Sequence, residues 1–118
     1  MQMPLQVTFR SMAHSDALAT HVERRVAKLD HFFQGIISCH VVVELAGHHQ
    51  RHGDRYRVLI NVGLPGHELV VNHAPSDDGN VENAHATTDR AFDEAGRQLE
   101  EWVKRRRVRR HEDSRRAT

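Results

Sequence analysis

Histidines are the most conspicuous candidates for chemistry in this sequence. The chain has eleven of them, and His48, His49 and His52 crowd one short stretch that follows His40. Imidazoles grouped in this way can hold a zinc or nickel ion. No cysteine or carboxylate completes a recognised ligand spacing, so we expect a polar loop that binds no metal. A histidine-loop metal protein or small enzyme is the least favoured alternative.

The sequence contains no recognised motif for any other kind of catalysis. The sequence has no glycine-rich phosphate loop, no nucleophile elbow and no HExxH. Cys39, the single cysteine, occupies an inward position of a predicted strand, which favours a small core residue over a nucleophile. Trp102 follows Leu99 at helical spacing, which favours the edge of the core over stacking on a base. We therefore predict no enzyme activity, no cofactor and no small-molecule substrate.

Basic side chains on two predicted helices form a more informative pattern. If the helices lie side by side, their outward faces make one surface that could neutralise phosphates and bind RNA with a strong salt dependence. The candidate RNA-binding residues are Arg24, Arg25 and Lys28 on the first helix, and Arg90, Arg97, Lys104, Arg105, Arg106 and Arg107 on the second.

The net charge of +1 hides an uneven distribution. Residues 104–118 hold eight of the 17 basic and two of the 16 acidic side chains, a net charge of +6, whereas the first 103 residues carry −5. A basic end on an acidic body suggests an anionic partner such as nucleic acid, or else a solvated tail that aids solubility. The N-terminus has no long apolar run and the one cysteine can form no internal disulfide, so we expect a cytoplasmic protein without a membrane anchor.

The elements that must position these residues follow from hydrophobic periodicity. Alternating apolar residues predict a strand from Leu5, then strands at 37–46, 55–63 and 67–73, with a loop over 47–54 and a tight turn at Pro65-Gly66. Apolar residues at spacings of three and four predict a helix from the Ser15 cap that Gly35 ends. A second such helix is predicted over about 81–107.

The resulting order is β-α-β-β-β-α. We predict an α+β domain in which two helices pack on one face of a four-stranded mixed sheet, with the first two strands parallel. The opposite face carries polar residues and would meet solvent, which favours a monomer. The domain is expected to cover residues 1–107, and residues 108–118 are expected to be a basic, disordered tail.

Several local motifs carry a family resemblance. The most specific is Val26-Ala27-Lys28-Leu29-Asp30-His31-Phe32-Phe33, a Lys-Leu pair before two aromatic residues; the others are Leu5 to Thr8, Ser15 to Val22, Val41 to Glu44, Tyr56 to Leu69, and Asp89 with Arg97-Gln98-Leu99. Together, over about residues 4–106, they resemble the ribosome hibernation-promoting factor family, also called the sigma-54 modulation or ribosome-associated inhibitor family.

The resemblance implies a non-enzymatic translation inhibitor. Such proteins bind the small ribosomal subunit and its rRNA in the channel used by mRNA and tRNA, and they promote ribosome hibernation in stationary phase or under stress. Arg25, Lys28 and Arg97 match basic positions of the family, which implies an RNA-binding role for them. The resemblance leaves open whether ribosome dimers or inactive single ribosomes result.

The chain also departs from the family pattern. His85 stands where relatives have a tyrosine, residues 76–82 look inserted, and Glu94, Glu100 and Glu101 stand where relatives tend to be basic. Acidic side chains near a phosphate path oppose binding. The alternative hypothesis is therefore a divergent member of the fold that acts as a regulatory module and binds a non-ribosomal protein.

Overall fold

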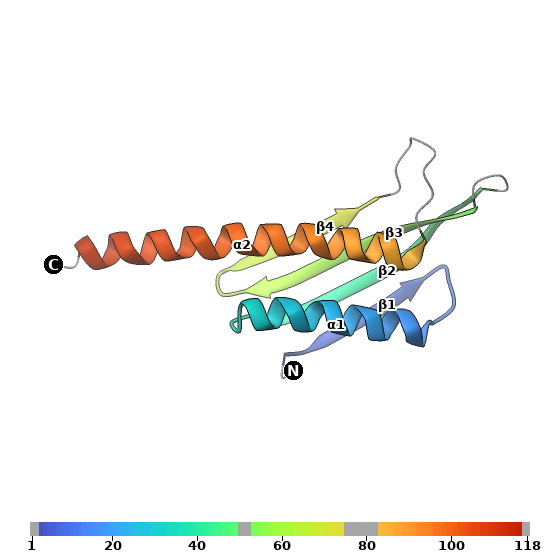
Figure 1. The fold of residues 1–118 in the computed structure, drawn as a ribbon, viewed down its shortest axis with the longest axis horizontal. Helices are drawn as coiled ribbons and strands as arrows, with labels where there is room; N and C mark the ends of the chain where they lie inside the picture. Colours follow the sequence, from blue (N-terminus) through green and yellow to red (C-terminus); the bar gives the residue numbers. More distant parts are fainter. Residues whose placement is uncertain (1–2, 50–52, 75–82, 117–118) are drawn as a thin grey trace.

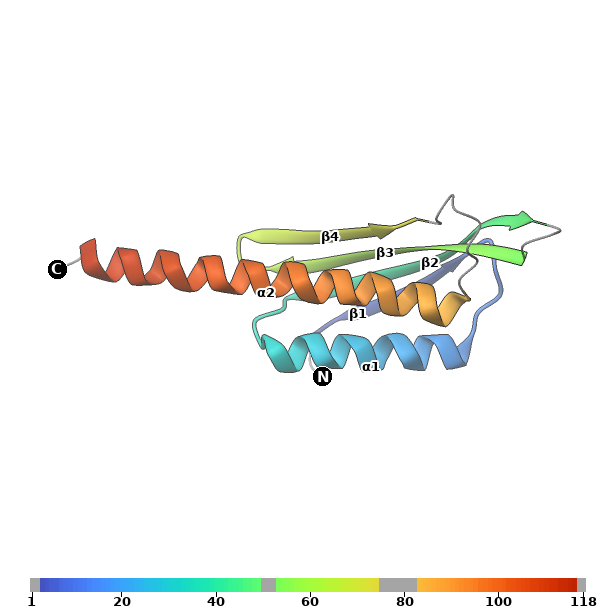
Figure 2. The ribbon, with the colours of Figure 1, turned by 45° about the horizontal axis from the view of Figure 1, so that its top comes forward.

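A computed structural model describes the backbone of residues 3–49, 53–74 and 83–116, and the side chains of residues 3–47, 54–74 and 83–109. The element order is β1 (Leu5–Arg10), α1 (Asp16–Phe32), β2 (Ser38–His49), β3 (Gly53–Leu64), β4 (His67–His73) and α2 (Ala84–Arg116). The strands form one sheet in the order β1-β2-β3-β4, in which β1 and β2 are parallel and the other neighbours antiparallel. Both helices cover the same face of this sheet (Figures 1 and 2). The predicted fold class is confirmed.

The core lies between the sheet and the two helices. Val41, Ile60 and Val71 are register partners on β2, β3 and β4, and all three are buried. Above them α1 contributes Leu18, Val22, Val26 and Leu29, while α2 contributes Thr88, Phe92, Ala95 and Leu99. These are the apolar stripes that the helical spacing predicted. Ser15 caps α1 as expected, because its hydroxyl accepts a hydrogen bond of 3.2 Å from the Leu18 amide.

The hairpin between β2 and β3 is longer than predicted. Residues 47–54 were expected to be a loop, but the two strands pair as far as His49 opposite Gly53. The register shifts between Leu45 and Gly47, which marks a bulge. Backbone hydrogen bonds pair strands whatever their side chains, whereas a strand is predicted from sequence by alternating apolar residues. Residues 47–54 are mostly polar, so this signal was absent and the strand ends were predicted as a loop.

Two helix ends also differ from the prediction. Phe33, in an extended conformation, caps α1 before Gly35 is reached. The role of Gly35 is steric, because a Cβ there would lie 2.5 Å from the Phe33 ring.

The second helix begins at Ala84 and continues to Arg116, so its predicted end near 107 is wrong. The stretch after Val103 holds no glycine or proline, and its many arginines favour a helix. Their charge also suits the negative end of the helix dipole. The structure thus shows a helix where a disordered tail was expected. The division into a domain of residues 1–107 and a separate tail stays a prediction.

Candidate nucleic-acid interface

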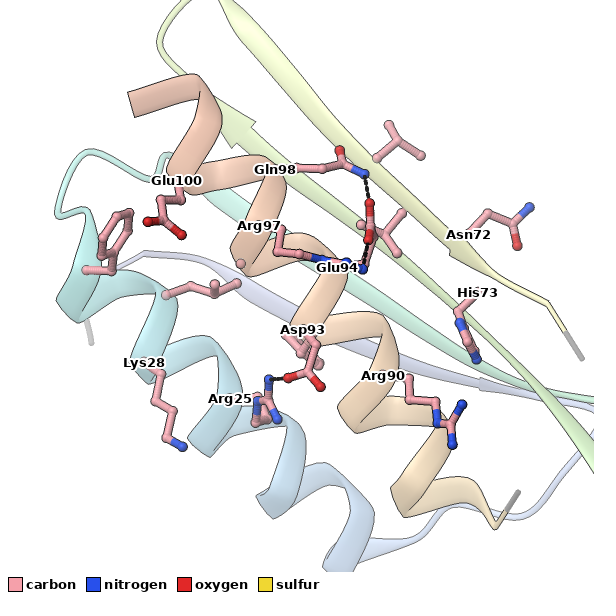
Figure 3. A pocket seen from close by; sticks show the side chains of 16 residues that line it. Arg25, Lys28, Asn72, His73, Arg90, Asp93, Glu94, Arg97, Gln98 and Glu100 are labelled. Atoms are coloured by element: carbon pink, nitrogen blue, oxygen red, sulfur yellow. Dashed lines mark hydrogen bonds and ion pairs between the residues drawn. The ribbon is translucent and has the colours of Figure 1, made fainter. Parts of the chain in front are cut away.

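The outward faces of α1 and α2 enclose an open hollow. It is lined by four of the predicted RNA-binding residues, Arg25, Lys28, Arg90 and Arg97, and it extends past α2 to the edge of β4 (Figure 3). Its volume is about 1120 Å³. Acidic side chains line the same hollow, namely Asp93, Glu94 and Glu100. The structure therefore brings these four cations together, but it also places carboxylates among them.

Arg25 joins the two helices across this hollow. Its Nη1 donates to Oδ1 of Asp89 at 3.0 Å and its Nη2 donates to Oδ1 of Asp93 at 2.7 Å. The guanidinium also lies 5.8 Å from the centre of the Phe92 ring. Only 21% of the Arg25 side chain is exposed. Two carboxylates neutralise it, so we assign Arg25 first to holding α1 against α2.

Asp89 has a second partner on α1. The Nε2 atom of His21 lies 2.7 Å from the Asp89 oxygen that also binds Arg25, and the His85 ring lies 5.3 Å from the His21 ring. Burial acts to raise the pKa of Asp89, but the hydrogen bonds and charges of His21 and Arg25 outweigh it and hold that pKa below its ordinary value. Asp89 is thus an ionised acceptor shared by two side chains of α1.

The other predicted cations differ in whether they are already paired, and among them Arg24 lies on α1 outside the lining of the hollow. Within the described residues, Arg24 and Lys28 are exposed and form no ion pair. Arg90 is exposed as well. Arg97 pairs with Glu94 one turn earlier, and Glu94 also accepts a hydrogen bond of 3.2 Å from Gln98 (Figure 3). Arg24 and Lys28 are therefore the side chains best placed to meet a phosphate without first breaking a contact.

The remaining predicted residues, Lys104 to Arg107, form a second group on α2. We call residues 104–109, which also include Arg109, the basic arm. Lys104 pairs with Glu100 at 3.6 Å and Arg105 pairs with Glu101 at 3.8 Å. Arg106 lies over the rings of Phe33 and Trp102, and Arg107 is exposed. The arm follows Val103, the last buried residue among the described side chains of α2, and leads into the part of the helix that extends past the sheet (Figure 1).

The sequence prediction missed the acidic half of the network between the helices. Asp89 was noted only as a family position, and Asp93 and His21 were assigned no role. A signal was present, because His21 and Arg25 are four residues apart on α1, as are Asp89 and Asp93 on α2. Such pairs lie on one face of a helix. Two facing helices with these pairs can therefore form a ladder of ion pairs.

Metal and thiol chemistry gain no support in the described part of the chain. No group of three or more histidine, cysteine or acidic side chains is placed there to hold a metal ion. His40 hydrogen-bonds to Thr8 at 3.0 Å, whereas the side chains of His48, His49 and His52 lie outside the described residues. Cys39 is buried, and burial raises the pKa of its thiol to about 11.

Comparison with known proteins places the chain in a family. The sequence model described as sigma 54 modulation protein / S30EA ribosomal protein matches residues 5–114. The chain belongs to this family. The match reaches beyond the segment that carried the sequence resemblance and takes in most of the extended part of α2. In this sigma 54 modulation / S30EA member, the basic arm thus lies within the residues that the family model matches. No helix in its described residues is both long and apolar enough to cross a membrane.

Solved structures support the assignment of the fold. The N-terminal domain of Thermus thermophilus Protein Y is 28% identical, covers 86% of this chain and 99% of its own, and superposes with a TM-score of 0.66. A ribosomal subunit interface protein from Coxiella burnetii is 22% identical with the same coverage and TM-score. No curated protein matches this S30EA-family chain significantly.

Proposed function

We propose that this protein is a non-enzymatic translation inhibitor that binds the small ribosomal subunit. Its contact would be the rRNA of the channel used by mRNA and tRNA, and its effect would be ribosome hibernation under stress or in stationary phase. The observation that carries the proposal is the family match over residues 5–114, which is nearly the whole chain. A cytoplasmic location and a monomeric free state belong to the same proposal.

The surface over the helices supports this role. Exposed Arg24 and Lys28 on α1, together with Arg90 on α2, lie on the side of the sheet that the helices cover. Side chains of this kind neutralise phosphates, and each phosphate contact releases counterions. Binding should therefore weaken steeply as the salt concentration rises.

The acidic side chains favour the alternative of a regulatory module with a protein partner. Glu94, Glu100 and Glu101 each pair with a cation that the RNA would otherwise meet, namely Arg97, Lys104 and Arg105. Exposed pairs of this kind contribute little free energy, about 0–1 kcal/mol, so a phosphate could replace the carboxylate. We therefore retain the ribosome as the first candidate.

Co-sedimentation with purified small ribosomal subunits tests the proposal. The full chain should pellet with subunits at low salt and be released as salt rises, and it should inhibit translation in a cell-free system. Lys28→Glu should weaken the binding strongly. Arg10→Glu is the matched control, since Arg10 is exposed on β1, away from the helices, and forms no ion pair among the described residues.

Two results would contradict the proposal in different ways. Equal loss of binding for Lys28→Glu and Arg10→Glu would overturn the assignment of the helix surface. Absence of subunit binding at low salt, together with capture of one non-ribosomal protein from a lysate, would favour the regulatory alternative.

A further inference from the structure

Four side chains gather at the point where the basic arm leaves the body of the protein. The Trp102 ring meets Phe33 edge-on, with centroids 5.3 Å apart at 76°. Arg106 lies 5.2 Å from the Trp102 ring and 5.7 Å from the Phe33 ring. His67 lies nearly parallel to Trp102, at 12° and 6.2 Å. The cluster thus joins the end of α1, the start of β4 and α2.

Trp102 is at the border of the core rather than inside it. Leu99 and Val103, its neighbours along α2, are buried, whereas Trp102 is only half-buried. Arg106 follows it by four residues, so the two side chains lie on the same face of the helix. The indole therefore presents surface that the protein's own apolar side chains do not cover.

The two polar neighbours of Trp102 are replaceable. His67 is exposed, and a centroid distance of 6.2 Å is near the upper end of the range for aromatic pairs. Arg106 is half-buried and is held by its contacts with the two rings. Imidazole and guanidinium are planar groups, and a nucleobase stacks on an aromatic ring in the same way.

Positive charge follows Trp102 along α2. Arg107 and Arg109 are exposed and form no ion pair within the described residues, and Lys104 and Arg105 are held only by long contacts to glutamates. Aromatic rings beside a row of cations are the combination by which proteins bind single-stranded nucleic acid without reading its sequence. An acidic peptide would use the cations but would gain nothing from the indole face.

We propose that Trp102, with Arg106 and His67 beside it, is a stacking site for a base of single-stranded RNA whose phosphates are held by the basic arm. The inference deepens the proposed function and rests on it, because it names a contact for RNA apart from the hollow between the helices. Arg106 then has two roles: it covers the indole in the free protein, and it stacks with the base or binds a phosphate in the complex.

The single tryptophan provides a direct measurement. Oligoadenylate of ten nucleotides and an abasic ribose-phosphate oligomer of the same length are titrated into the full chain at low salt. Oligoadenylate should quench the Trp102 fluorescence and bind roughly tenfold more tightly than the abasic oligomer, since base stacking adds to the phosphate contacts. Polyglutamate should bind more weakly and leave the fluorescence unquenched.

Two variants separate stacking from charge. Trp102→Leu, followed through a fluorescent label on the RNA, should lose roughly tenfold in affinity for oligoadenylate and nothing for the abasic oligomer. Arg109→Gln should weaken both oligomers equally, because it removes a charge at a distance from the ring. If Trp102→Leu fails to fold, the comparison of the two oligomers on the natural chain decides the question.

The outcomes distinguish this inference from the proposed function. Equal binding and equal quenching by oligoadenylate and the abasic oligomer would overturn the stacking site, even in a protein that pellets with subunits. Equal affinity for polyglutamate would overturn it as well. Preference for oligoadenylate in a protein that binds no subunits would support the stacking site and refute the ribosomal role.

Discussion

The guanidinium of Arg25 on α1 is bound by the carboxylate of Asp89 on α2, 64 residues away, at 3.0 Å. Asp93 takes the other terminal nitrogen, and His21 shares the Asp89 oxygen. An arginine that sequence reasoning assigned to RNA is thus a contact between helices. This distinction between paired and unpaired cations leads to most of the predictions below.

Removal of the shared carboxylate should loosen the helix pair. Asp89→Asn should lower the free energy of unfolding at pH 7 by about 1 kcal/mol, because charged hydrogen bonds are lost at a site that water partly screens. The pKa of Asp89 lies below its ordinary 3.8 in the folded protein. Its stabilising effect is therefore present above pH 3.8 and is lost as the pH falls through the lowered value.

Urea unfolding at pH 7 and at pH 3 measures this effect. The gap between the natural chain and Asp89→Asn should narrow below pH 3.8. Asp30→Asn is the control, since Asp30 forms no ion pair among the described residues, and it should change stability by less than about 0.5 kcal/mol. An unchanged stability for Asp89→Asn at pH 7 would contradict a stabilising role for the bridge.

Lys28, which is unpaired, should contribute more to RNA binding than Arg25, which is paired with carboxylates. Affinity for the subunit falls as salt rises, and the plot of log affinity against log salt has a negative slope. Lys28→Gln should reduce the magnitude of that slope by about one. Arg25→Gln should leave that slope nearly unchanged while it destabilises the fold, because its charge is already neutralised by Asp89 and Asp93. Sedimentation across a salt series measures both. The reverse order of effects would show that Arg25 leaves its carboxylates to contact phosphate.

Removal of the Glu94 carboxylate should strengthen binding to the small ribosomal subunit. Glu94→Gln frees Arg97 and removes a negative charge from the hollow. Affinity for the small subunit should rise roughly two- to fivefold, the range that an exposed ion pair accounts for. Glu68→Gln changes the net charge equally on the exposed edge strand and should have no such effect. Identical gains for both variants would indicate a net-charge effect alone.

Cys39 should be inert in the folded protein. Only the thiolate reacts, and burial raises the pKa of this thiol to about 11, so almost none is ionised at pH 8. A chromogenic disulfide reagent should therefore leave the native chain unmodified at that pH and should label its one thiol at once in denaturing urea. Rapid labelling of the native chain would mean that the strand carrying Cys39 opens readily.

The extended part of α2 should serve binding rather than stability. Among the side chains that the structure describes, Val103 is the last buried one on α2, and the deletion of residues 108–118 leaves it in place. The free energy of unfolding should therefore change by less than about 0.5 kcal/mol. The salt dependence of subunit binding should decrease, because the deleted stretch is rich in arginine. A large loss of stability would contradict the division of the chain at residue 107.

The sequence by itself determined the element types and the core. The two-residue period of β2 to β4 and the three-four spacing of Val22, Val26 and Leu29 depend only on local backbone geometry, and the structure buries the inward faces they predict. The Pro65-Gly66 turn follows likewise, since Gly66 adopts a φ of 67° that glycine tolerates. These features need no knowledge of what lies across the fold.

Only the tertiary structure decided the role of Arg25. Whether Arg25 meets a phosphate or a carboxylate depends on Asp89 and Asp93, and nothing local brings those residues to it. The same holds for Trp102, whose neighbours come from the end of α1 and from the start of β4. An ion pair between helices depends on which side chains lie within a few ångströms in space. The hydrophobic period of a helix or strand depends only on the order of residues along the chain. The sequence therefore listed the basic residues, and the packing of α1 against α2 decided that Arg25 is held by carboxylates.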